Sequence, residues 1–336
     1  MESNNIHPVV SVIIPVYNIE RYLGACLASV IAQTFRNFEA IVVVDGATDG
    51  SLQIARDCAE RDVRIVVVAT PNQGVARARK EGLDRARGRY ICFLDGDDIW
   101  EPDMLRELTS AISLNGGYDI VCCNFKRIRP TFEAPVRERY TQDMEGLMFL
   151  EATLCHAISA TVWARIYRRE LFDEGLRHYP LHLGEDTLVN IQIGCRRPRV
   201  HFISYVGYGY LQRAGSANRS RLDIGYCSRF SEIVAQELDR CPGLDPKQTE
   251  FLLLLSKVRW YVVYLGKSRN PWVGNMEYVR QIHVQSKRFR VELRRYFPRA
   301  DLLLLRLDQR KWMRPGRLLL ATLIRWCKSL RRRMAR

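Results

Sequence analysis

Three carboxylates stand within four residues of one another, directly after a short apolar run that predicts a buried strand. Asp95, Asp97 and Asp98 form the sequence DGDD after Tyr90–Leu94. Clustered carboxylates repel one another and are costly to bury unpaired, and a divalent cation offsets both penalties. Mg²⁺ and Mn²⁺ both accept carboxylate and phosphate oxygens as ligands. The pattern indicates a metal–diphosphate site or, alternatively, an acidic turn that caps the helix expected from Glu101.

Asp45 is a second acidic position at the end of an apolar run, Phe38–Val44. A carboxylate at the end of a buried strand could accept hydrogen bonds from a base or a ribose. The residues that follow it, Thr48 and Asp49, are more simply interpreted as caps of the next helix.

Glu185 and Asp186 begin a stretch with apolar residues at helical spacing. The N-terminus of a helix favours negative charge, so the pair could simply cap this helix. In a cleft, partial burial would raise the pKa of such a carboxylate into a range useful for a general base. Both interpretations remain open from the residues alone.

Strands and helices alternate over the first 125 residues and would position these groups. The expected strands are Val9–Pro15, Phe38–Val44, Arg64–Ala69, Tyr90–Leu94 and Tyr118–Asn124. The expected helices are Ile19–Gln33, Asp49–Glu60, Gly74–Ala86 and Glu101–Leu114. This order predicts an α/β fold, a Rossmann-like and mostly parallel sheet flanked by helices. In such sheets ligands bind at the carboxyl ends of the strands, where the polar loops of this chain would gather.

The rest of the chain is less regular. The pattern over residues 128–145 predicts a surface loop or a mobile segment, and a second patterned region runs from 148 to 216. Helical patterns follow at Tyr226–Leu238, Lys247–Leu265, Met276–Tyr296 and Arg317–Arg333. We therefore expect one domain over residues 1–216, with halves 1–125 and 126–216, and a helical C-terminal region over 217–336.

Five stretches of this sequence resemble the family 2 inverting glycosyltransferases, which have the GT-A fold. They are SVIIPVYN, DGATDGS, the segment from NQGVARARK to DGDDIW, VWARIYRRELF and GEDTLVN, in the order and spacing of the family. The resemblance covers residues 9–216. It implies a nucleotide-sugar-binding half over 1–125, an acceptor half over 126–216, and metal-dependent transfer with inversion at the anomeric carbon.

The resemblance also implies roles for single residues on the donor side. Pro15, Tyr17 and Asn18 match the loop that frames the nucleotide, and Asp45 matches an acid that contacts the nucleoside. Val44 and Ala47 replace an acid and a serine of the family's pattern, which leaves base selectivity open. A UDP-sugar is the expected donor.

Other matches concern the sugar, the metal and the reaction. Asp95 matches a sugar or ribose contact and Asp97 a ligand of Mg²⁺ or Mn²⁺, while Asp186 matches the catalytic base. Arg79 matches an arginine that lies near the phosphates or orients an acid, next to Lys80 where the family has asparagine. Arg213 would neutralise the leaving diphosphate, or is an ordinary surface arginine.

The implied enzyme is a hexosyl- or N-acetylhexosaminyltransferase. The QxxRW sequence of the processive members is missing, because Ser256 and Thr322 stand where the glutamine of Arg259-Trp260 and Arg325-Trp326 would be. We therefore expect transfer of one sugar to a glycan or lipid-linked acceptor in surface polysaccharide or glycolipid biosynthesis.

Charge is concentrated at the C-terminus. The chain has a net charge of +15, and 17 Lys and Arg against three Asp and Glu lie from Lys287 onward. Residues 317–336 combine apolar positions at helical spacing with basic ones, which predicts a helix at a membrane interface or, alternatively, one packed on the body. Because the remainder is near neutral, the high net charge is not evidence that the whole protein binds nucleic acid, and a polyanion is a lesser alternative to lipid as the partner of the tail.

The ten cysteines include no CxxC pair and no zinc-finger spacing, which favours a reducing compartment. No secretory signal pattern opens the chain and no apolar run reaches the ~18 residues of a membrane span. We expect a cytoplasmic protein, with peripheral contact at the inner face of the plasma membrane through the basic C-terminal helix.

Two other functions remain open at this point. A non-catalytic sugar-nucleotide or glycan-binding protein on the same fold would explain Val44, Ala47 and Lys80. A nucleotidyltransferase would also use carboxylate-bound Mg²⁺, but it gives Glu185 and Asp186 no role.

Overall fold

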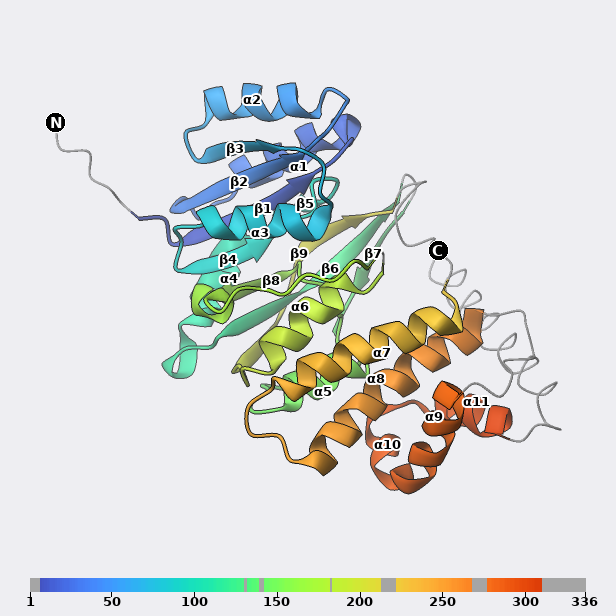
Figure 1. The fold of residues 1–336 in the computed structure, drawn as a ribbon. Helices are drawn as coiled ribbons and strands as arrows, with labels where there is room; N and C mark the ends of the chain where they lie inside the picture. Colours follow the sequence, from blue (N-terminus) through green and yellow to red (C-terminus); the bar gives the residue numbers. More distant parts are fainter. Residues whose placement is uncertain are drawn as a thin grey trace. The chain divides into compact units, whose positions relative to one another are not determined.

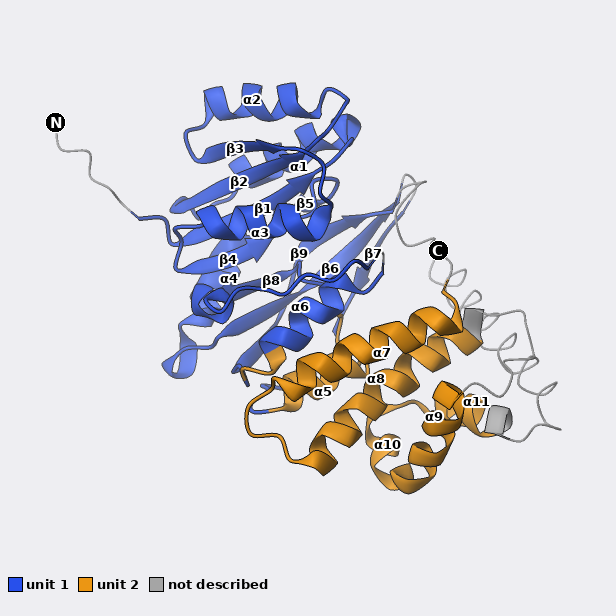
Figure 2. Ribbon diagram, viewed as in Figure 1, with its two compact units in different colours: residues 1–146, 161–193, 197–216 blue, residues 147–160, 194–196, 217–336 orange. Residues whose placement is uncertain are grey.

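The chain forms two compact units, which Figure 2 distinguishes by colour. The computed structural model describes residues 7–129, 132–138, 142–181, 183–212, 222–267 and 277–309. Unit 1 comprises residues 1–146, 161–193 and 197–216, and unit 2 comprises residues 147–160, 194–196 and 217–336. Unit 2 thus includes two segments that precede residue 216, since α5 (Met148–Leu154) packs against α8 (Pro246–Lys267).

Unit 1 has the expected α/β fold, built on one sheet (Figure 1). Its strands are β1 (Val10–Val16), β2 (Phe38–Asp45), β3 (Ile65–Thr70), β4 (Tyr90–Phe93), β5 (Ile99–Trp100), β6 (Ile120–Arg129), β7 (Phe132–Val136), β8 (Arg165–Arg168) and β9 (Val200–Leu211). The order across the sheet is β3-β2-β1-β4-β8-β6-β9-β5, with β7 paired to β6. Its α-helices are α1 (Glu20–Ile31), α2 (Ser51–Arg61), α3 (Val75–Arg85), α4 (Met104–Ile112) and α6 (Glu185–Gly194).

The sheet is parallel in its first half and mixed in its second. Strands β3, β2, β1 and β4 pair in parallel, as expected, and β6 pairs in parallel with β9. Strand β8 runs antiparallel between β4 and β6, and β5 and β7 are also antiparallel to their partners. A strand alternates its side chains with the same period in either direction, so the sequence pattern could not reveal this reversal.

The surface loop predicted over residues 128–145 is partly wrong. Strand β6 continues to Arg129, and β7 pairs antiparallel with it from Phe132 to Val136. Arg, Glu and Pro obscured the strand pattern, but these residues are tolerated in β7, which pairs with β6 alone among the described strands and is therefore an edge strand. An ion pair of 2.8 Å between Lys126 and Glu133 joins the two strands.

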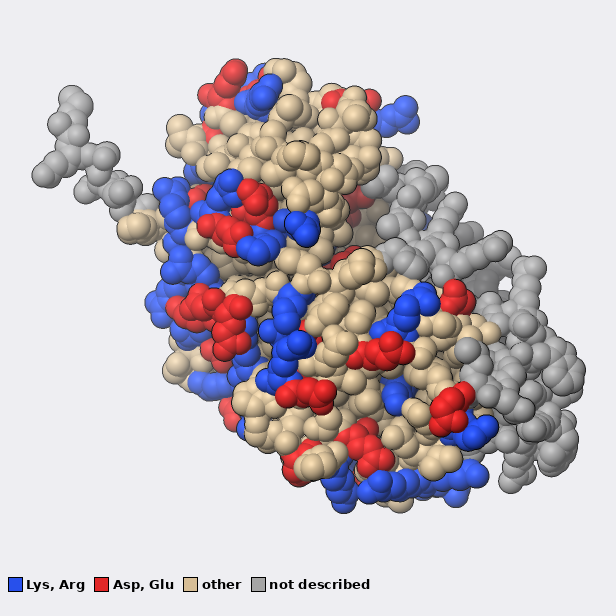
Figure 3. All heavy atoms as spheres, viewed as in Figure 1, with Lys and Arg blue, Asp and Glu red and all other residues tan. Residues whose placement is uncertain are grey.

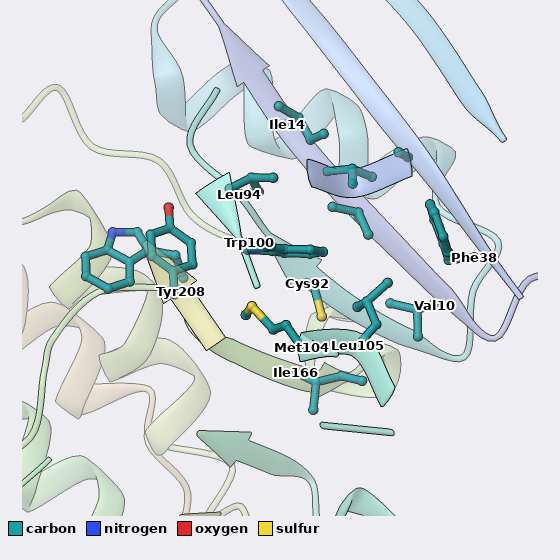
Figure 4. Close-up of a cluster of buried hydrophobic side chains, with 14 of the residues drawn as sticks. Val10, Ile14, Phe38, Cys92, Leu94, Trp100, Met104, Leu105, Ile166 and Tyr208 are labelled. Carbon is teal, nitrogen blue, oxygen red and sulfur yellow. The ribbon is translucent and has the colours of Figure 1, made fainter. Parts of the chain in front are cut away.

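The core of unit 1 shows why β1 and β2 are mostly apolar. Every residue of both strands is buried. Val10, Val12 and Ile14 of β1 belong to a cluster with residues of α1 and α4 (Figure 4). The alternate residue Ile13 faces Gly82 of α3 on the other side. Helices therefore cover both faces of the sheet and leave the strand ends for the loops.

Unit 2 is helical in its described part. Helix α8 contacts α5, α7 (Ile224–Asp239), α9 (Glu277–Arg288) and α11 (Arg299–Gln309). The single helix predicted over Met276–Tyr296 is divided at Phe289, where α9 ends and α10 (Arg290–Tyr296) begins. No helix among the described residues is long and apolar enough to cross a membrane. The helix predicted over 317–333 lies outside the described residues.

Candidate active site

Hydrogen bonds tie the loops after β1 and β2 to each other at the carboxyl edge of the sheet. The Oδ1 of Asn18, a residue with φ of 49°, accepts the N–H of Thr48 at 2.8 Å. The Oε2 of Glu20 accepts the N–H of Gly50 at 2.7 Å, and Asp49 accepts the N–Hs of Glu20 and Ser51. Asn18 therefore shapes this loop pair. Asp49 bonds the first residue of α2, but the N-cap of this helix is Gly50 without a side-chain cap, so the expected cap by Thr48 is wrong.

Tyr17 and Pro15 differ sharply in exposure. The Tyr17 side chain is 50% exposed, so its ring is available to a ligand. Pro15 is buried in β1, and a Cβ on Gly96 would come within 3.1 Å of its carbonyl oxygen. The first loop and the DGDD turn are thus in close contact, and a side chain at position 96 would require the end of Ile19 and the backbone nearby to shift.

Asp45 is only 3% exposed and is bonded to the loop after β3. Its Oδ1 accepts the N–H of Gln73 at 2.9 Å, and its Oδ2 accepts the N–H of Gly74 at 2.7 Å. The neighbouring Gly46 has φ of +66°, and a Cβ there would come within 2.5 Å of the Asn72 nitrogen. Asp45 therefore fixes the shape of the edge where a nucleoside would bind.

Arg79 brings two of the predicted site acids together. It lies on α3, is 6% exposed, and donates from Nη2 to Asp95 Oδ1 at 2.8 Å and from Nη1 to Asp186 Oδ1 at 2.6 Å. Burial lowers the pKa of its guanidinium, but the attraction of Asp186 and Asp95 outweighs it and the pKa is raised. A permanently charged arginine thus joins the DGDD turn to the start of α6.

Asp186 stands in the first turn of α6 and also accepts the N–H of Val162 through Oδ2 at 3.3 Å. Burial raises its pKa to about 6; Arg79 opposes the shift, and Glu185 and Asp95 add to it. The carboxylate is therefore ionised at neutral pH and is a stronger base than an ordinary aspartate. Those properties suit a group that accepts a proton from a hydroxyl.

Asp98 has a structural position that the sequence did not reveal. It is 1% exposed, and its carboxylate accepts the hydroxyl of Tyr208 at 2.6 Å and the N–H of Leu211 at 2.7 Å. Burial raises its pKa to about 8, and the charges of Asp95 and Asp97 add to the shift. Asp98 therefore anchors β9 to the turn that carries the other two acids.

Tyr208 is a further residue that sequence reasoning missed. Its hydroxyl also accepts the N–H of Asp95 at 3.3 Å, and its ring stacks on Trp163 with centroids 4.4 Å apart. Trp163 follows Val162, which bonds Asp186. The alternation of Tyr208, Gly209 and Tyr210 in β9 was the available signal, because it places two aromatic rings on one face of a strand.

The residues at the DGDD turn fit a divalent cation that shares its coordination with a ligand. Asp97 is partly exposed there, and the charges of Asp95 and Asp97 raise the pKa of Asp98, so the local potential is negative. No group of three or more His, Cys, Asp or Glu in the described segments could hold a metal alone. A Mg²⁺ or Mn²⁺ ion held by one carboxylate, phosphate oxygens and water matches this donor set. Arg213 lies outside the described residues.

Comparisons with known proteins agree with this fold. Residues 11–176 match the family model described as glycosyl transferase family 2. The chain is 35% identical over 216 residues to the glycosyltransferase EpsJ of Bacillus subtilis, and the match covers 62% of each protein. It is 30% identical over 249 residues to a cholesterol galactosyltransferase of Borreliella burgdorferi, which covers 70% of this chain and 68% of that relative.

Among solved structures, residues 1–349 of S. aureus TarS in complex with UDP-GlcNAc have a TM-score of 0.69 to this chain. The sequences are 19% identical over 94% of this chain and 91% of that chain. At this level of identity the likeness demonstrates a shared fold. The match to EpsJ spans less than two thirds of that relative's length.

Proposed function

Because this chain belongs to glycosyl transferase family 2 and has the GT-A fold, we propose that it is an inverting, metal-dependent transferase of single sugars. It moves a sugar from a nucleotide-sugar donor to a hydroxyl of a glycan or lipid-linked acceptor, in surface polysaccharide or glycolipid biosynthesis. The observation that carries the proposal is the double contact of Arg79 with Asp95 and Asp186. The proposed base and the DGDD turn thus contact one guanidinium. This supports a reaction in which both act on the same carbon.

Asp186 is the base of the proposed reaction. It removes the proton of the acceptor hydroxyl, whose oxygen attacks the anomeric carbon from the face opposite the nucleoside diphosphate. The bond to the diphosphate breaks, and the configuration inverts in one step, so no second carboxylate nucleophile is needed. Arg79 and the N–H of Val162 orient the two oxygens of Asp186 for this transfer.

The other proposed residues act on the donor. Asp97 would hold a Mg²⁺ or Mn²⁺ ion whose charge offsets that of the leaving phosphates. Asp95 contacts the sugar or ribose, with Arg79 fixing its Oδ1. Arg213 is proposed to neutralise the leaving diphosphate.

A UDP-sugar is the proposed donor. TarS, which shares the fold, was crystallised with UDP-GlcNAc and with UDP, which supports this choice. The exposed ring of Tyr17 would lie against the nucleotide, framed by Pro15 and Asn18. Asp45 would contact the nucleoside directly or through the loop that it holds at Gln73 and Gly74.

The proposed acceptor is a glycan or a lipid-linked molecule. The relative from Borreliella burgdorferi, named as a cholesterol galactosyltransferase, supports an apolar acceptor. The basic, amphipathic residues 317–336 would place a cytoplasmic enzyme at the inner face of the plasma membrane. If removal of residues 317–336 leaves liposome binding unchanged, this part of the proposal is wrong.

The test of the site is the release of nucleoside diphosphate and the transfer of sugar by two variants, Asp97→Asn and Asp186→Asn. Both should lose transfer by two orders of magnitude or more, while Asp57→Asn, on helix α2, should keep wild-type rates. Full activity of both folded site variants would show that the assignment is wrong.

The test of the donor is the thermal stability of the wild-type protein with UDP, GDP, CDP and dTDP, each with and without Mn²⁺. A ligand that binds the native state raises the melting temperature by mass action. We expect a metal-dependent rise with UDP. Saturable binding without any hydrolysis or transfer would instead favour a sugar-nucleotide-binding protein.

A further inference from the structure

Unit 1 has a large hollow at the edge of the sheet opposite the candidate active site. The hollow has a volume of about 890 Å³ and is lined by segments next to the first residues of β1 and β4. Val10 pairs with Tyr90, and Tyr90 with Arg168 at the end of the antiparallel strand β8, so all three strands reach this edge. The DGDD turn follows the other end of β4. The hollow is thus separate from the site described above.

Four arginines line the hollow, and they come from three segments of the chain. They are Arg87 after α3, Arg89 before β4, Arg106 on α4 and Arg169 after β8. All four are exposed, and Figure 3 shows Lys and Arg side chains gathered along this edge beside the N-terminal residues. Glu170 is the single acid among the lining residues.

The four arginines differ in their partners. Arg87 bonds Glu39 through two nitrogens, and Arg106 pairs with Asp103 and Glu107. Arg89 and Arg169 have no ion pair with an acid within the described segments. The N–H of Arg169 donates to the carbonyl of Arg89 at 3.0 Å, so these two residues are direct neighbours on adjacent backbones. Arg169 Nη1 also donates to the carbonyl of Ala86 at 3.4 Å, and the guanidinium of Arg89 lies 5.4 Å from the centroid of the Tyr90 ring. The other N–H groups of these two guanidiniums have no acidic partner within the described segments and are available to a ligand.

The remaining lining residues indicate which chemical groups a ligand would carry beside its anionic group. Val9, Phe35 and Tyr90 supply apolar surface, and Ser110 and Ser113 supply hydroxyls. The planar fork of an arginine matches two oxygens of a phosphate, and a pair of forks suits a phosphate better than a single carboxylate. An occupant with a phosphate next to an apolar part would use both kinds of surface.

We propose that this hollow binds a phosphate ester, with its phosphate held by Arg89 and Arg169 and its apolar part lying on Val9, Phe35 and Tyr90. The headgroup of an anionic membrane lipid and a free phosphate ester share this chemistry. If the phosphate belongs to a lipid headgroup, unit 1 would contact a membrane by itself, independently of residues 317–336.

The test compares the full-length wild type with the double variant Arg89→Gln/Arg169→Gln. A matched control is Arg56→Gln/Arg61→Gln, which removes two exposed arginines from α2, away from both sites. The probes are glycerol 3-phosphate in isothermal titration calorimetry, and sedimentation with phosphatidylglycerol or phosphatidylcholine vesicles. Transfer to a soluble acceptor should be unchanged in both variants, which verifies their folding.

We expect the wild type to bind at least one of the phosphate-bearing probes, and the Arg89/Arg169 variant to bind that probe on the order of 10-fold more weakly or worse. The control pair should lose less than two-fold. Loss of phosphatidylglycerol binding identifies a lipid headgroup, whereas loss of glycerol 3-phosphate binding alone identifies a free ester. Equal losses in both double variants, or no binding by the wild type, would overturn the proposal.

Discussion

Of the site residues, Asp186 allows the most direct prediction of how the reaction rate depends on pH. An aspartate with an ordinary pKa would stay ionised down to about pH 4. Burial among Glu185 and Asp95 raises the pKa of Asp186 to about 6, and Arg79 limits the shift. As a base it acts only when ionised, so activity should be full above the raised pKa and fall as the pH decreases through it.

The prediction is a kcat/KM that is level near pH 7.5 and falls tenfold per pH unit below about pH 6. The profile should be measured between pH 5 and 8, with circular dichroism at each pH to verify that the protein is folded. A level profile down to pH 5 would contradict the assignment of Asp186 as the base.

Tyr208 provides a second prediction for a single residue, as a positioning group rather than a catalytic one. In Tyr208→Phe the stack on Trp163 remains, but the bonds of the hydroxyl to Asp98 and to the N–H of Asp95 are lost. Because the pKa of Asp98 is about 8, its carboxyl group is largely neutral near pH 7. Each of the two hydrogen bonds contributes about 0.5–1.5 kcal/mol, so kcat/KM should fall by about 5- to 100-fold.

The matched control is Tyr205→Phe on the same strand, which should leave kcat/KM within two-fold of the wild type. Because the change should act through the DGDD turn, most of the loss in Tyr208→Phe should be in kcat. Equal losses in both variants would indicate a general weakening of β9 instead.

At the scale of elements, helix α3 positions Arg79 by lying very close to the sheet. A Cβ on Gly82 would come within 2.5 Å of Ile13 Cγ2, whereas a Cβ on Gly24 of α1 would meet nothing within 4 Å. We predict that Gly82→Ala lowers the free energy of unfolding by about 1–3 kcal/mol because of this overlap.

Gly24→Ala is the control and should raise the free energy of unfolding by about 0.5–1 kcal/mol, since alanine favours a helix. Urea unfolding of both variants measures the difference. If Gly82→Ala stabilises the protein as Gly24→Ala does, the inference that α3 lies too close to β1 for a side chain at position 82 is wrong. A displaced α3 should also move Arg79, so the Gly82 variant should lose activity at urea concentrations too low to unfold it.

The sequence allowed most of the elements in the first half of unit 1 to be predicted. Helices α1 to α4 lie within a few residues of their predicted ranges, because their apolar spacing and the buried strands between them are strong signals. The direction of β8 and the hairpin of β6 and β7 were missed. Both depend on strand pairing, which a local pattern does not encode.

The same limit applies to the site. The acids at 95, 97 and 186 could be found from their positions after strands and before a helix. Arg79 and Asp186 are 107 residues apart, and only the order of the strands brings them together. Asp98 and Tyr208 are similarly joined across 110 residues. Contacts of this kind require the tertiary structure.

For the whole molecule, the two units should respond differently to acid because of His156 in unit 2. Burial, with the charge of Arg259, lowers the pKa of His156 to about 3. It is therefore neutral in the native state, while the unfolded chain takes up a proton below about pH 6.5. Stability is full above pH 6.5 and is lost as the pH falls from there towards 3.

We predict that the free energy of unfolding of unit 2 falls by about 1–2 kcal/mol between pH 7 and pH 5. His156→Asn should remove this dependence, and asparagine also tolerates the φ of 52° at this position. Amide hydrogen exchange of α5 and α8 reports on this unit. His201→Asn, in unit 1, is the control; the same loss of pH dependence in both variants would contradict the role of His156.

The place of β8 in the sheet has a consequence for synthesis of the chain. Strand β4 is complete at Phe93, but its second neighbour, β8, is made only at Arg165–Arg168, after β6, which lies on the far side of β8. In a nascent chain that ends between these points, β4 has an open edge because β8 has not been made. Strand β6, if it is already made, must leave room for β8 between itself and β4. Open edges promote pairing with other chains. Pausing of the ribosome within residues 94–164 should therefore favour aggregation more than pausing after residue 168.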